Sequence, residues 1–382
     1  MNYINFKIAW RNVWRNKLRS MVVISAVAVG LFGGLSGTGV MKGMVLDLVK
    51  NALHSQVSNI QIHNEKFKEN SEIAYFLESS SEILQEIKTQ EYVLGVSQRT
   101  KSYGMASTAS KGLGVMINGI EPENEKNVTD IYAKIIEGQG DYFVSDKKNR
   151  IVIGEKLAKK LNAKVKSKIV LTFQDYEGNL SGASFKVEGI FKTYNTTWDE
   201  SNVFVKKEDI DRLLMMPKNA SHEIAVLLDN NDASEEVAAK IRKQVPQYLV
   251  ETWFVLQPYL NMSYSMVSYM LFIFMSIIML ALGFAIVNTM LMVVLERTKE
   301  LGMIMAIGMN KFKVFKMIMW ETSLLAIVGG IVGIAVTYLF TSYFGVHGID
   351  ISSVGEGFEA MGYSSVMYPV LYLSDYIEVV IL

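Results

Sequence analysis

The segment Leu295–Lys316, which reads LERTKELGMIMAIGMNKFKVFK, decides how this chain is organised. Its middle part, Leu301–Met309, has no charged residue over nine positions and lies between two clusters of charged side chains. Nine residues are too few for a helix that crosses a bilayer, which needs about 20. The segment therefore predicts a short apolar helix between two membrane-length apolar runs.

Three uncharged runs are long enough to form transmembrane helices. Met21–Val40 has no charge over 20 residues, Met266–Leu295 has none over 30, and Val328–Phe344 lies within the uncharged run 322–346. Each run meets the length of about 20 residues that a spanning helix needs. The alternative for the first run is a signal peptide, but it is too long for an h-region and no A-x-A site follows. We expect a membrane anchor.

The overall composition is intermediate between two classes of protein. The 382 residues are 50% hydrophobic and 20% charged, and the mean hydropathy is +0.21. The chain is too polar for a pure membrane bundle and too apolar for a simple soluble domain. Basic and acidic residues balance at 38 each, so no net charge points to nucleic acid. The absence of cysteine excludes disulfides and thiolate metal sites.

The charges beside the apolar runs predict their orientation. Residues 1–20 hold five basic residues and no acidic one, and residues 296–316 also hold five basic residues. By contrast, residues 341–376 hold four acidic residues and no Lys or Arg. The positive-inside rule therefore puts the N-terminus and the segment 296–316 in the cytoplasm. The region 50–262 is then extracytoplasmic.

This extracytoplasmic region reads as a mixed α/β domain. Strand-like patterns occur in NIQIHN (59–64), IVLTFQ (169–174), FKVEGIFKT (185–193) and EIAVLLD (223–229). Amphipathic helix patterns occur in EILQEIK (82–88), EKLAKKL (155–161) and SEEVAAKIRKQV (234–245). Turn signals such as YEGNLSG and DNNDAS separate them.

Two features predict that membrane helices continue into a stalk. Apolar residues keep helical spacing beyond the first span, from Met41 to Leu53. The second run, at 30 residues, is about 45 Å long as a helix, whereas the hydrocarbon core is about 30 Å thick. The alternative is a tilted or overlong span.

The N-terminal 20 residues predict an amphipathic helix at the membrane interface. Basic residues recur every four positions, including Arg11 and Arg15, and Trp10 and Trp14 lie on the other face. A basic stripe opposite tryptophans suits a helix in the headgroup region. The alternative is flanking charge with no further role.

Motifs for catalysis or ligand binding are absent from the sequence. The chain has no G-x-x-x-x-G-K-[ST] phosphate loop and no G-x-S-x-G elbow, and its four histidines lack ligand spacing. We therefore expect no catalytic residue, no metal site and no cofactor on this chain. The pairs Gly30/Gly34 and Gly33/Gly37 have the spacing of close helix packing, although random matches are common in glycine-rich spans.

The short apolar helix needs a surface to cover it. A region this small cannot bury nine apolar residues alone, and a groove on a partner protein is one physical solution. Glu296, Arg297, Lys299 and Glu300 would then form a polar rim. The alternatives are the membrane surface or the chain's own helices.

The same residues resemble a known family. Asn288–Gly333 resembles the FtsX-like domain of mechanotransmission (type VII) ABC transporter permeases, a group that includes MacB, LolC and LolE. The family pattern E-R-x-x-E-[IL]-G-x-x-x-A-[IL]-G falls on Glu296, Arg297, Glu300, Leu301, Gly302, Ala306, Ile307 and Gly308. IAWRNVWRNKLRS (8–20) is similar to the family's N-terminal helix, and SNIQIHNEKF (58–67) is similar to the lipoprotein-releasing LolC/LolE branch.

The resemblance implies an α-helical membrane domain of four spans, with a large mixed α/β domain inserted between spans 1 and 2. Only the start of span 4 is present, and we expect that span to be truncated here. The implied divisions are an amphipathic helix (1–20), span 1 and stalk (21–49), the MacB-like periplasmic domain (50–262), stalk and span 2 (263–295), a coupling helix loop (296–316), span 3 (317–344), an external loop (345–375) and the start of span 4 (376–382).

The resemblance also implies function. The coupling helix would sit on a separate ABC ATPase subunit, present in two copies, which holds ATP and Mg²⁺, while this chain is a non-catalytic permease. A second permease copy or a paralogue, membrane lipids and a periplasmic chaperone are further implied partners. We expect a multi-pass protein of the bacterial inner membrane that extracts lipoproteins for the outer membrane. The alternatives are MacB-like efflux of antimicrobial peptides, toxins or macrolides, and FtsX-like regulation of cell-wall hydrolases.

Overall fold

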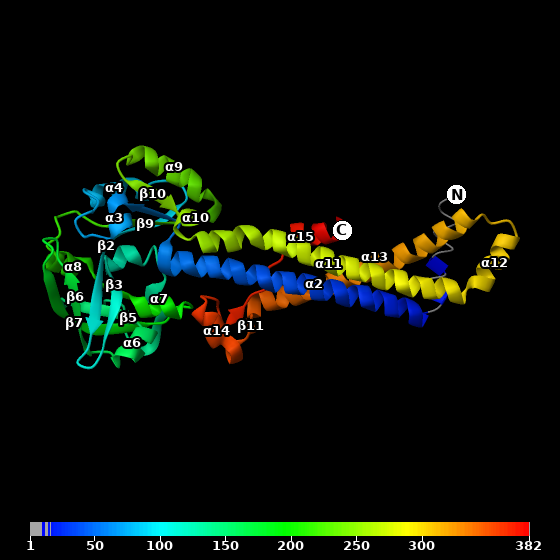
Figure 1. Cartoon of the computed structure of the whole chain (residues 1–382), viewed down its shortest axis with the longest axis horizontal. Helices are drawn as coiled ribbons and strands as arrows, with labels where there is room; N and C mark the ends of the chain where they lie inside the picture. Colours follow the sequence, from blue (N-terminus) through cyan, green and yellow to red (C-terminus); the bar gives the residue numbers. More distant parts are fainter. Residues whose placement is uncertain (1–9, 12–13, 16, 382) are drawn as a thin grey trace. The chain divides into compact units, whose positions relative to one another are not determined.

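A computed structural model describes residues 10–11, 14–15 and 17–381. The chain divides into two compact units, whose elements are labelled in Figure 1. The membrane unit comprises the described residues of 1–45, 264–350 and 366–382. The α/β unit comprises 46–263 and 351–365.

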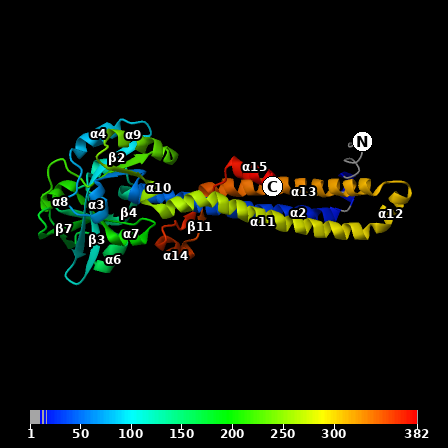
Figure 2. The ribbon, with the colours of Figure 1, turned by 45° about the horizontal axis from the view of Figure 1, so that its top comes forward.

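Three helices of the described chain are long and apolar enough to cross a membrane. They are α2 (Lys17–Ala52), α11 (Pro258–Glu296) and α13 (Lys311–His347). In the membrane unit they run side by side (Figures 1 and 2). Each contains one of the three uncharged runs. The shorter elements of this unit are α12 (Thr298–Ala306), β11 (Ile349–Asp350), β12 (Val366–Met367) and α15 (Leu373–Ile381).

Small residues let α13 approach α2 closely. A Cβ atom on Gly329 would lie 2.8 Å from the Cβ of Val27, and one on Gly333 would lie 3.0 Å from the carbonyl oxygen of Ala28. Neither position leaves room for a side chain, so the two helices pack backbone against backbone. Nearby, an apolar cluster joins α2, α11 and α13 through Val23, Met290, Val293, Leu324 and Leu325.

The α/β unit is built on one mixed sheet of ten strands. The strands are β1 (Ile60–His63), β2 (Val93–Ser107), β3 (Gly112–Ile120), β4 (Ile135–Gly140), β5 (Arg150–Gly154), β6 (Lys168–Gln174), β7 (Leu180–Phe191), β8 (Asn202–Lys206), β9 (Glu223–Leu228) and β10 (Leu249–Thr252). Their order is β10-β1-β9-β2-β3-β8-β5-β7-β4, with β6 paired to β2 and β7. The pairs β3–β8 and β5–β7 are parallel.

Helices of the α/β unit accompany this sheet. They are the π-helix η1 (Leu53–Val57), α3 (Glu65–Asn70), α4 (Ser80–Lys88), α5 (Pro122–Glu125), the 3₁₀ helices η2 (Ile131–Lys134), η3 (Asn231–Ala233) and η4 (Ser352–Val354), α6 (Glu155–Leu161), α7 (Thr196–Ser201), α8 (Lys207–Leu214), α9 (Ser234–Gln244), α10 (Trp253–Leu256) and α14 (Gly355–Ala360). The predicted strands at β1, β6, β7 and β9, and the predicted helices at α4, α6 and α9, are therefore confirmed.

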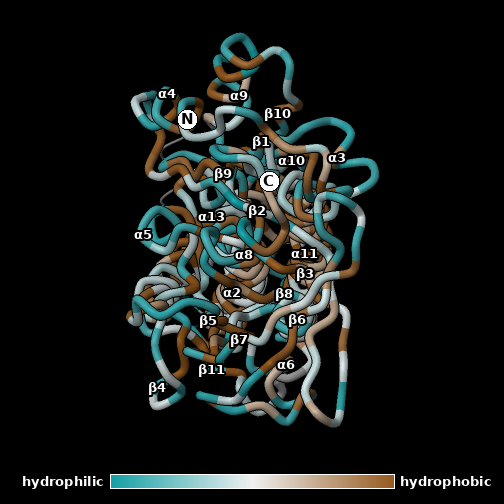
Figure 3. The backbone as a smooth tube through the Cα atoms, turned by 90° about the vertical axis from the view of Figure 1, so that its left-hand side faces the viewer, coloured by the Kyte–Doolittle hydropathy of each residue, from teal (hydrophilic) through white to brown (hydrophobic). Residues whose placement is uncertain are grey.

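Two hydrophobic cores share the long strand β2. One core includes Ala106 of β2 with residues of α6 and α8, and the other includes Val96 of β2 with residues of α4 and α9. Hydrophobic and hydrophilic stretches alternate along α9 (Figure 3), whose Val237 and Ile241 are buried. Because β2 belongs to both cores, the unit is not divided into two independent lobes.

The segment 351–365 belongs to the α/β unit although it follows α13 in the sequence. The Glu359 carboxylate pairs with Lys192 at 3.1 Å and accepts a hydrogen bond from Ser365 Oγ at 2.6 Å. Burial opposes ionisation of Glu359, but Ser365 and Lys192 outweigh it and lower its pKa. These contacts fix the segment on the turn that precedes α7.

Candidate coupling site

The predicted coupling segment forms the helix α12, which lies between α11 and α13 (Figure 1). It ends where Gly308 adopts φ +107°, a backbone conformation that side chains disfavour. Asn310 then caps α13, because its Oδ1 accepts a hydrogen bond from the Phe312 N–H at 3.2 Å. A glycine and an asparagine thus make the turn between the two helices.

Most apolar side chains of this segment are uncovered in the chain. Met303, Met305 and Ile307 are 64%, 38% and 83% exposed. Leu301 is different, because it packs against Val314 and Met317 of α13. The segment therefore attaches to its own chain through Leu301 and Met309, and leaves Met303, Met305 and Ile307 exposed.

The charged residues of the segment contact one another and neighbouring helices. Arg15 Nη2 lies 2.9 Å from Glu300 Oε2, and the Arg297 Nε–H donates to the same oxygen at 3.1 Å. Hydrogen bonds from Arg15 and Arg297 lower the pKa of Glu300. Arg297 Nη1 also lies 3.5 Å from Glu321 Oε2 on α13. Two predicted rim residues, Arg297 and Glu300, thus have partners within the chain.

Glu321 was not singled out by the sequence patterns. It is buried in a 300 Å³ cavity that is also lined by Arg15, Glu296, Arg297 and Glu300. The available signal was a lone carboxylate that interrupts an apolar stretch, MIMWETSLL. A buried carboxylate is costly unless it is paired, and Glu321 is paired with Arg297.

The remaining residues predicted for the segment lie at its surface. Glu296, Ala306 and Gly308 are exposed, and Gly302 is partly buried. A Cβ atom on Gly302 or Gly308 would meet nothing within 4 Å. Their contact with a partner stays a prediction.

The predicted interface helix is described in part. Trp10, Arg11, Trp14 and Arg15 are helical and exposed, and the two tryptophan rings meet edge to face with centroids 6.0 Å apart. Lys7 of the predicted basic face and Phe6 and Val13 of the predicted apolar face lie outside the described residues. The headgroup location stays a prediction.

The predicted packing glycines face different surroundings. A Cβ atom on Gly30 would lie 2.5 Å from Leu282, and one on Gly34 would lie 3.1 Å from Ile278, both on α11. A Cβ on Gly33 or Gly37 would meet nothing within 4 Å. The closest contact with α13 instead uses Gly329 and Gly333, which the sequence patterns did not single out.

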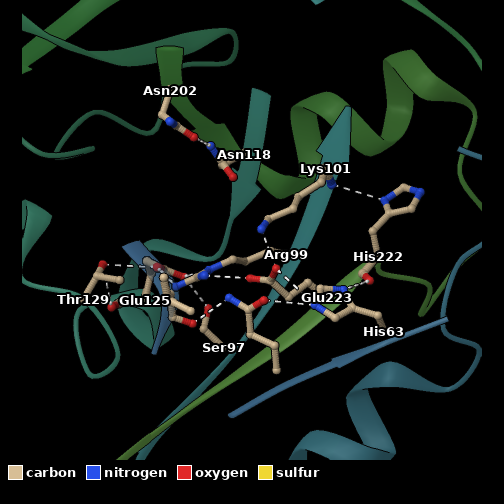
Figure 4. Close-up of polar contacts among 12 residues, drawn as sticks. His63, Ser97, Arg99, Lys101, Asn118, Glu125, Thr129, Asn202, His222 and Glu223 are labelled. Carbon is tan, nitrogen blue, oxygen red and sulfur yellow. Dashed lines mark hydrogen bonds and ion pairs between the residues drawn. The ribbon is translucent and has the colours of Figure 1, made fainter. Parts of the chain in front are cut away.

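A second polar cluster is buried in the α/β unit (Figure 4). Arg99 pairs with Glu125 and with Glu223, each at 2.7 Å, and Lys101 also contacts Glu223. Burial disfavours the charged form of Glu223, but Lys101 and Arg99 outweigh it and lower its pKa to about 2. Burial lowers the pKa of the neighbouring His222 to about 4.

This cluster ties β2 to β9 and to α5 and is closed to solvent. The side chains of Arg99, Glu125 and Glu223 are at most 4% exposed. Among residues 10–11, 14–15 and 17–381, no group of three or more His, Cys, Asp or Glu could hold a metal ion.

Two family models match the chain. The FtsX-like permease C-terminal model matches residues 272–381, and the MacB-like periplasmic core domain model matches residues 20–244, which is more than half of the chain. The chain belongs to the FtsX/MacB-type family of ABC transporter permeases.

Relatives of this permease carry several names. The lipoprotein-releasing system transmembrane protein LolC of Neisseria meningitidis is 23% identical over 357 residues, which cover 87% of this chain and 81% of that protein. The uncharacterized ABC transporter permease YknZ of Bacillus subtilis is 22% identical, with 87% and 85% covered. The macrolide export ATP-binding/permease protein MacB of Mannheimia succiniciproducens is 37% identical over 76 residues, which cover 20% of this permease and 12% of that protein.

Proposed function

We propose that this permease docks a separate ATP-hydrolysing subunit on α12. The exposed apolar side chains Met303, Met305 and Ile307 support this, because a groove on a partner would remove them from water. The chain has no phosphate-cradling motif of its own. The partner would therefore bind Mg²⁺ and hydrolyse ATP, and this chain would transmit the resulting motion.

The substrate that we propose is a lipoprotein, extracted from the inner membrane for delivery to the outer membrane. The observation that carries this proposal is the extent of the similarity to LolC, which is named a lipoprotein-releasing protein and aligns with 87% of this permease. The MacB relative aligns with 20%.

The proposed assembly has two permease subunits, identical or paralogous, and two ATPase subunits. The basic residues near the N-terminus and in the loop 296–316 support a cytoplasmic side for both. The α/β unit would then be periplasmic. Since α2 and α11 each contain residues of both units, these two helices would carry motion from one unit to the other.

A second candidate is MacB-type export of peptides, toxins or macrolides. The match of residues 20–244 to the MacB-like periplasmic core domain favours it. Depletion of the permease separates the two candidates. Lipoprotein release predicts outer-membrane lipoproteins stranded at the inner membrane. Normal lipoprotein sorting together with greater sensitivity to a macrolide or antimicrobial peptide would contradict it and support export.

A further inference from the structure

One guanidinium joins the start of α12 to the neighbouring helix α13. Arg297 is the residue before the first turn of α12, and it contacts Glu300 within that turn at 3.1 Å. The same guanidinium reaches Glu321 of α13 at 3.5 Å. Residues 24 positions apart in the sequence are thereby held together.

Of the three ion pairs among the described residues at the start of α12, Arg297–Glu321 and Arg15–Glu300 differ most in exposure. The side chains of Arg297 and Glu321 are 15% and 9% exposed, whereas those of Arg15 and Glu300 are 56% and 52% exposed. Water screens an exposed pair, so such a pair contributes little. A sheltered pair is screened less, so its loss costs more, and Glu321→Gln would leave Arg297 paired with the exposed Glu300. The position of α12 therefore depends on Arg297 and Glu321 more than on Arg15.

A second contact acts one helical turn later. Leu301 of α12 packs in one apolar cluster with Val314 and Met317 of α13. A single apolar contact would leave α12 free to rotate about it. The ion pair of Arg297, just before α12, and the contact of Leu301, four residues later, hold α12 against α13 at two points.

We propose that Arg297 and Glu321 are positioning residues that make α12 and α13 move as one body. This inference rests on the proposed docking of an ATPase on α12. Without the ion pair, a displacement of α12 would be absorbed by bending at the turn, where Gly308 lacks a side chain. With it, the displacement is passed to α13. Arg297 then acts inside the permease rather than on the rim of the docking surface.

Distance measurements test the link without any substrate. The chain has no cysteine, so spin labels at Met303→Cys and Phe315→Cys report only on α12 and α13. In the full-length permease we expect one narrow distance distribution, which Glu321→Gln and Arg297→Glu should each broaden. The reversed pair Arg297→Glu/Glu321→Arg should narrow it again. Lys313→Gln is the control, because it removes an exposed charge from α13 outside the ion pair, and it should leave the distribution narrow.

The second readout is the amount of lipoprotein released per ATP hydrolysed. The Glu321→Gln permease should retain its ATPase subunit and hydrolyse ATP. It should release at least about threefold less lipoprotein per ATP hydrolysed than the unaltered permease. The reversed pair should recover most of this loss. A narrow distribution in Glu321→Gln, or no recovery in the reversed pair, would overturn the inference. Failure of the unaltered permease to bind any ATPase would instead reject the proposed function, and the distance result would stand by itself.

Discussion

Arg99 of β2 and Glu223 of β9 lie directly opposite each other in the sheet, and their side chains form an ion pair of 2.7 Å that is closed to solvent. Arg99 also binds Glu125, so a single cation is shared by two carboxylates. Arg99 lies on β2 between Val96, which belongs to one core, and Ala106, which belongs to the other. The ion pair therefore holds β2, the strand that contributes residues to both cores.

Arg99→Met should destabilise the α/β unit by about 3–5 kcal/mol, because Glu125 loses its cation and Glu223 loses one of its partners while it keeps Lys101 and His63. Hydrogen exchange of the β2 and β9 amides measures this loss in the full-length permease. Lys126→Met, which removes an exposed pair with Glu123, is the control and should cost less than about 1 kcal/mol. Equal protection in both variants would show that the buried pair is dispensable.

The α/β unit should lose stability as the pH falls from 6.5 toward 4. Burial lowers the pKa of His222 from 6.5 to about 4, so the unfolded chain binds a proton in this range and the folded chain does not. Each unit of pKa difference corresponds to about 1.4 kcal/mol. His222→Gln should flatten the slope of unfolding free energy against pH. An unchanged slope would contradict the assignment.

Asp199 provides an internal check, because it acts in the opposite direction. Burial raises its pKa from 3.8 to about 6, although Thr193 donates two hydrogen bonds to it. The folded chain therefore binds this proton first, and the contribution of Asp199 to stability grows as the pH falls from 6 to 3.8. Asp199→Asn should steepen the loss of stability on acidification that His222→Gln flattens.

Gly333→Leu should push α13 away from α2. The added side chain would meet the Ala28 carbonyl oxygen at its first carbon atom, and we expect a loss of about 1–3 kcal/mol. Thermal unfolding in mild detergent measures the effect. Gly330→Ala is the matched control on the same helix, since its Cβ would lie 3.9 Å from Leu31. If both variants unfold at the same temperature, the close approach of α13 to α2 does not contribute to stability.

Ala306→Glu should release the proposed ATPase subunit, because it places a charge on the exposed apolar surface of α12 without a partner to compensate it. Ala306→Ser should retain the subunit. Co-purification in mild detergent compares them, and membrane insertion should be the same for both. A full complement of ATPase on Ala306→Glu would exclude α12 as the docking helix.

Lys192→Glu should loosen the segment 351–365, because it turns the pair with Glu359 into a repulsion. The side chains are 42% and 19% exposed, so the effect should be below about 1 kcal/mol and weaker at high salt. Hydrogen exchange within the segment should rise. The reversed pair Lys192→Glu/Glu359→Lys should restore protection, and no recovery would mean that the ion pair does not hold the segment.

The parts of this fold that could be predicted are those recorded in local patterns. Uncharged runs predicted α2, α11 and α13, and alternating residues predicted strands such as β6 and β9. Contacts between distant residues left no such pattern. Nothing near Lys192 in the sequence indicates that it pairs with Glu359. The pairs Gly33/Gly37 and Gly329/Gly333 have the same four-residue spacing, but only Gly329 and Gly333 lie in close contact with another helix.

The candidate site divides in the same way. The apolar helix α12 and its charged neighbours were predictable, because they stand out from their surroundings in sequence. The ion-pair partners of these charged residues were not predictable, because Arg297 pairs with Glu321 of the next long helix, α13. Sequence reasoning assigned Arg297 and Glu300 to an outward rim, whereas both also bind within the chain.

The discontinuity of the α/β unit limits how chimeras of this permease can be made. The unit takes Leu46–Ser263 together with the distant segment Ile351–Ser365. A graft from a relative that exchanges only the first stretch would therefore remove Lys192 and leave Glu359 of the retained segment opposite a foreign residue. The transplantable module has four breakpoints rather than two, and none of them falls within β2.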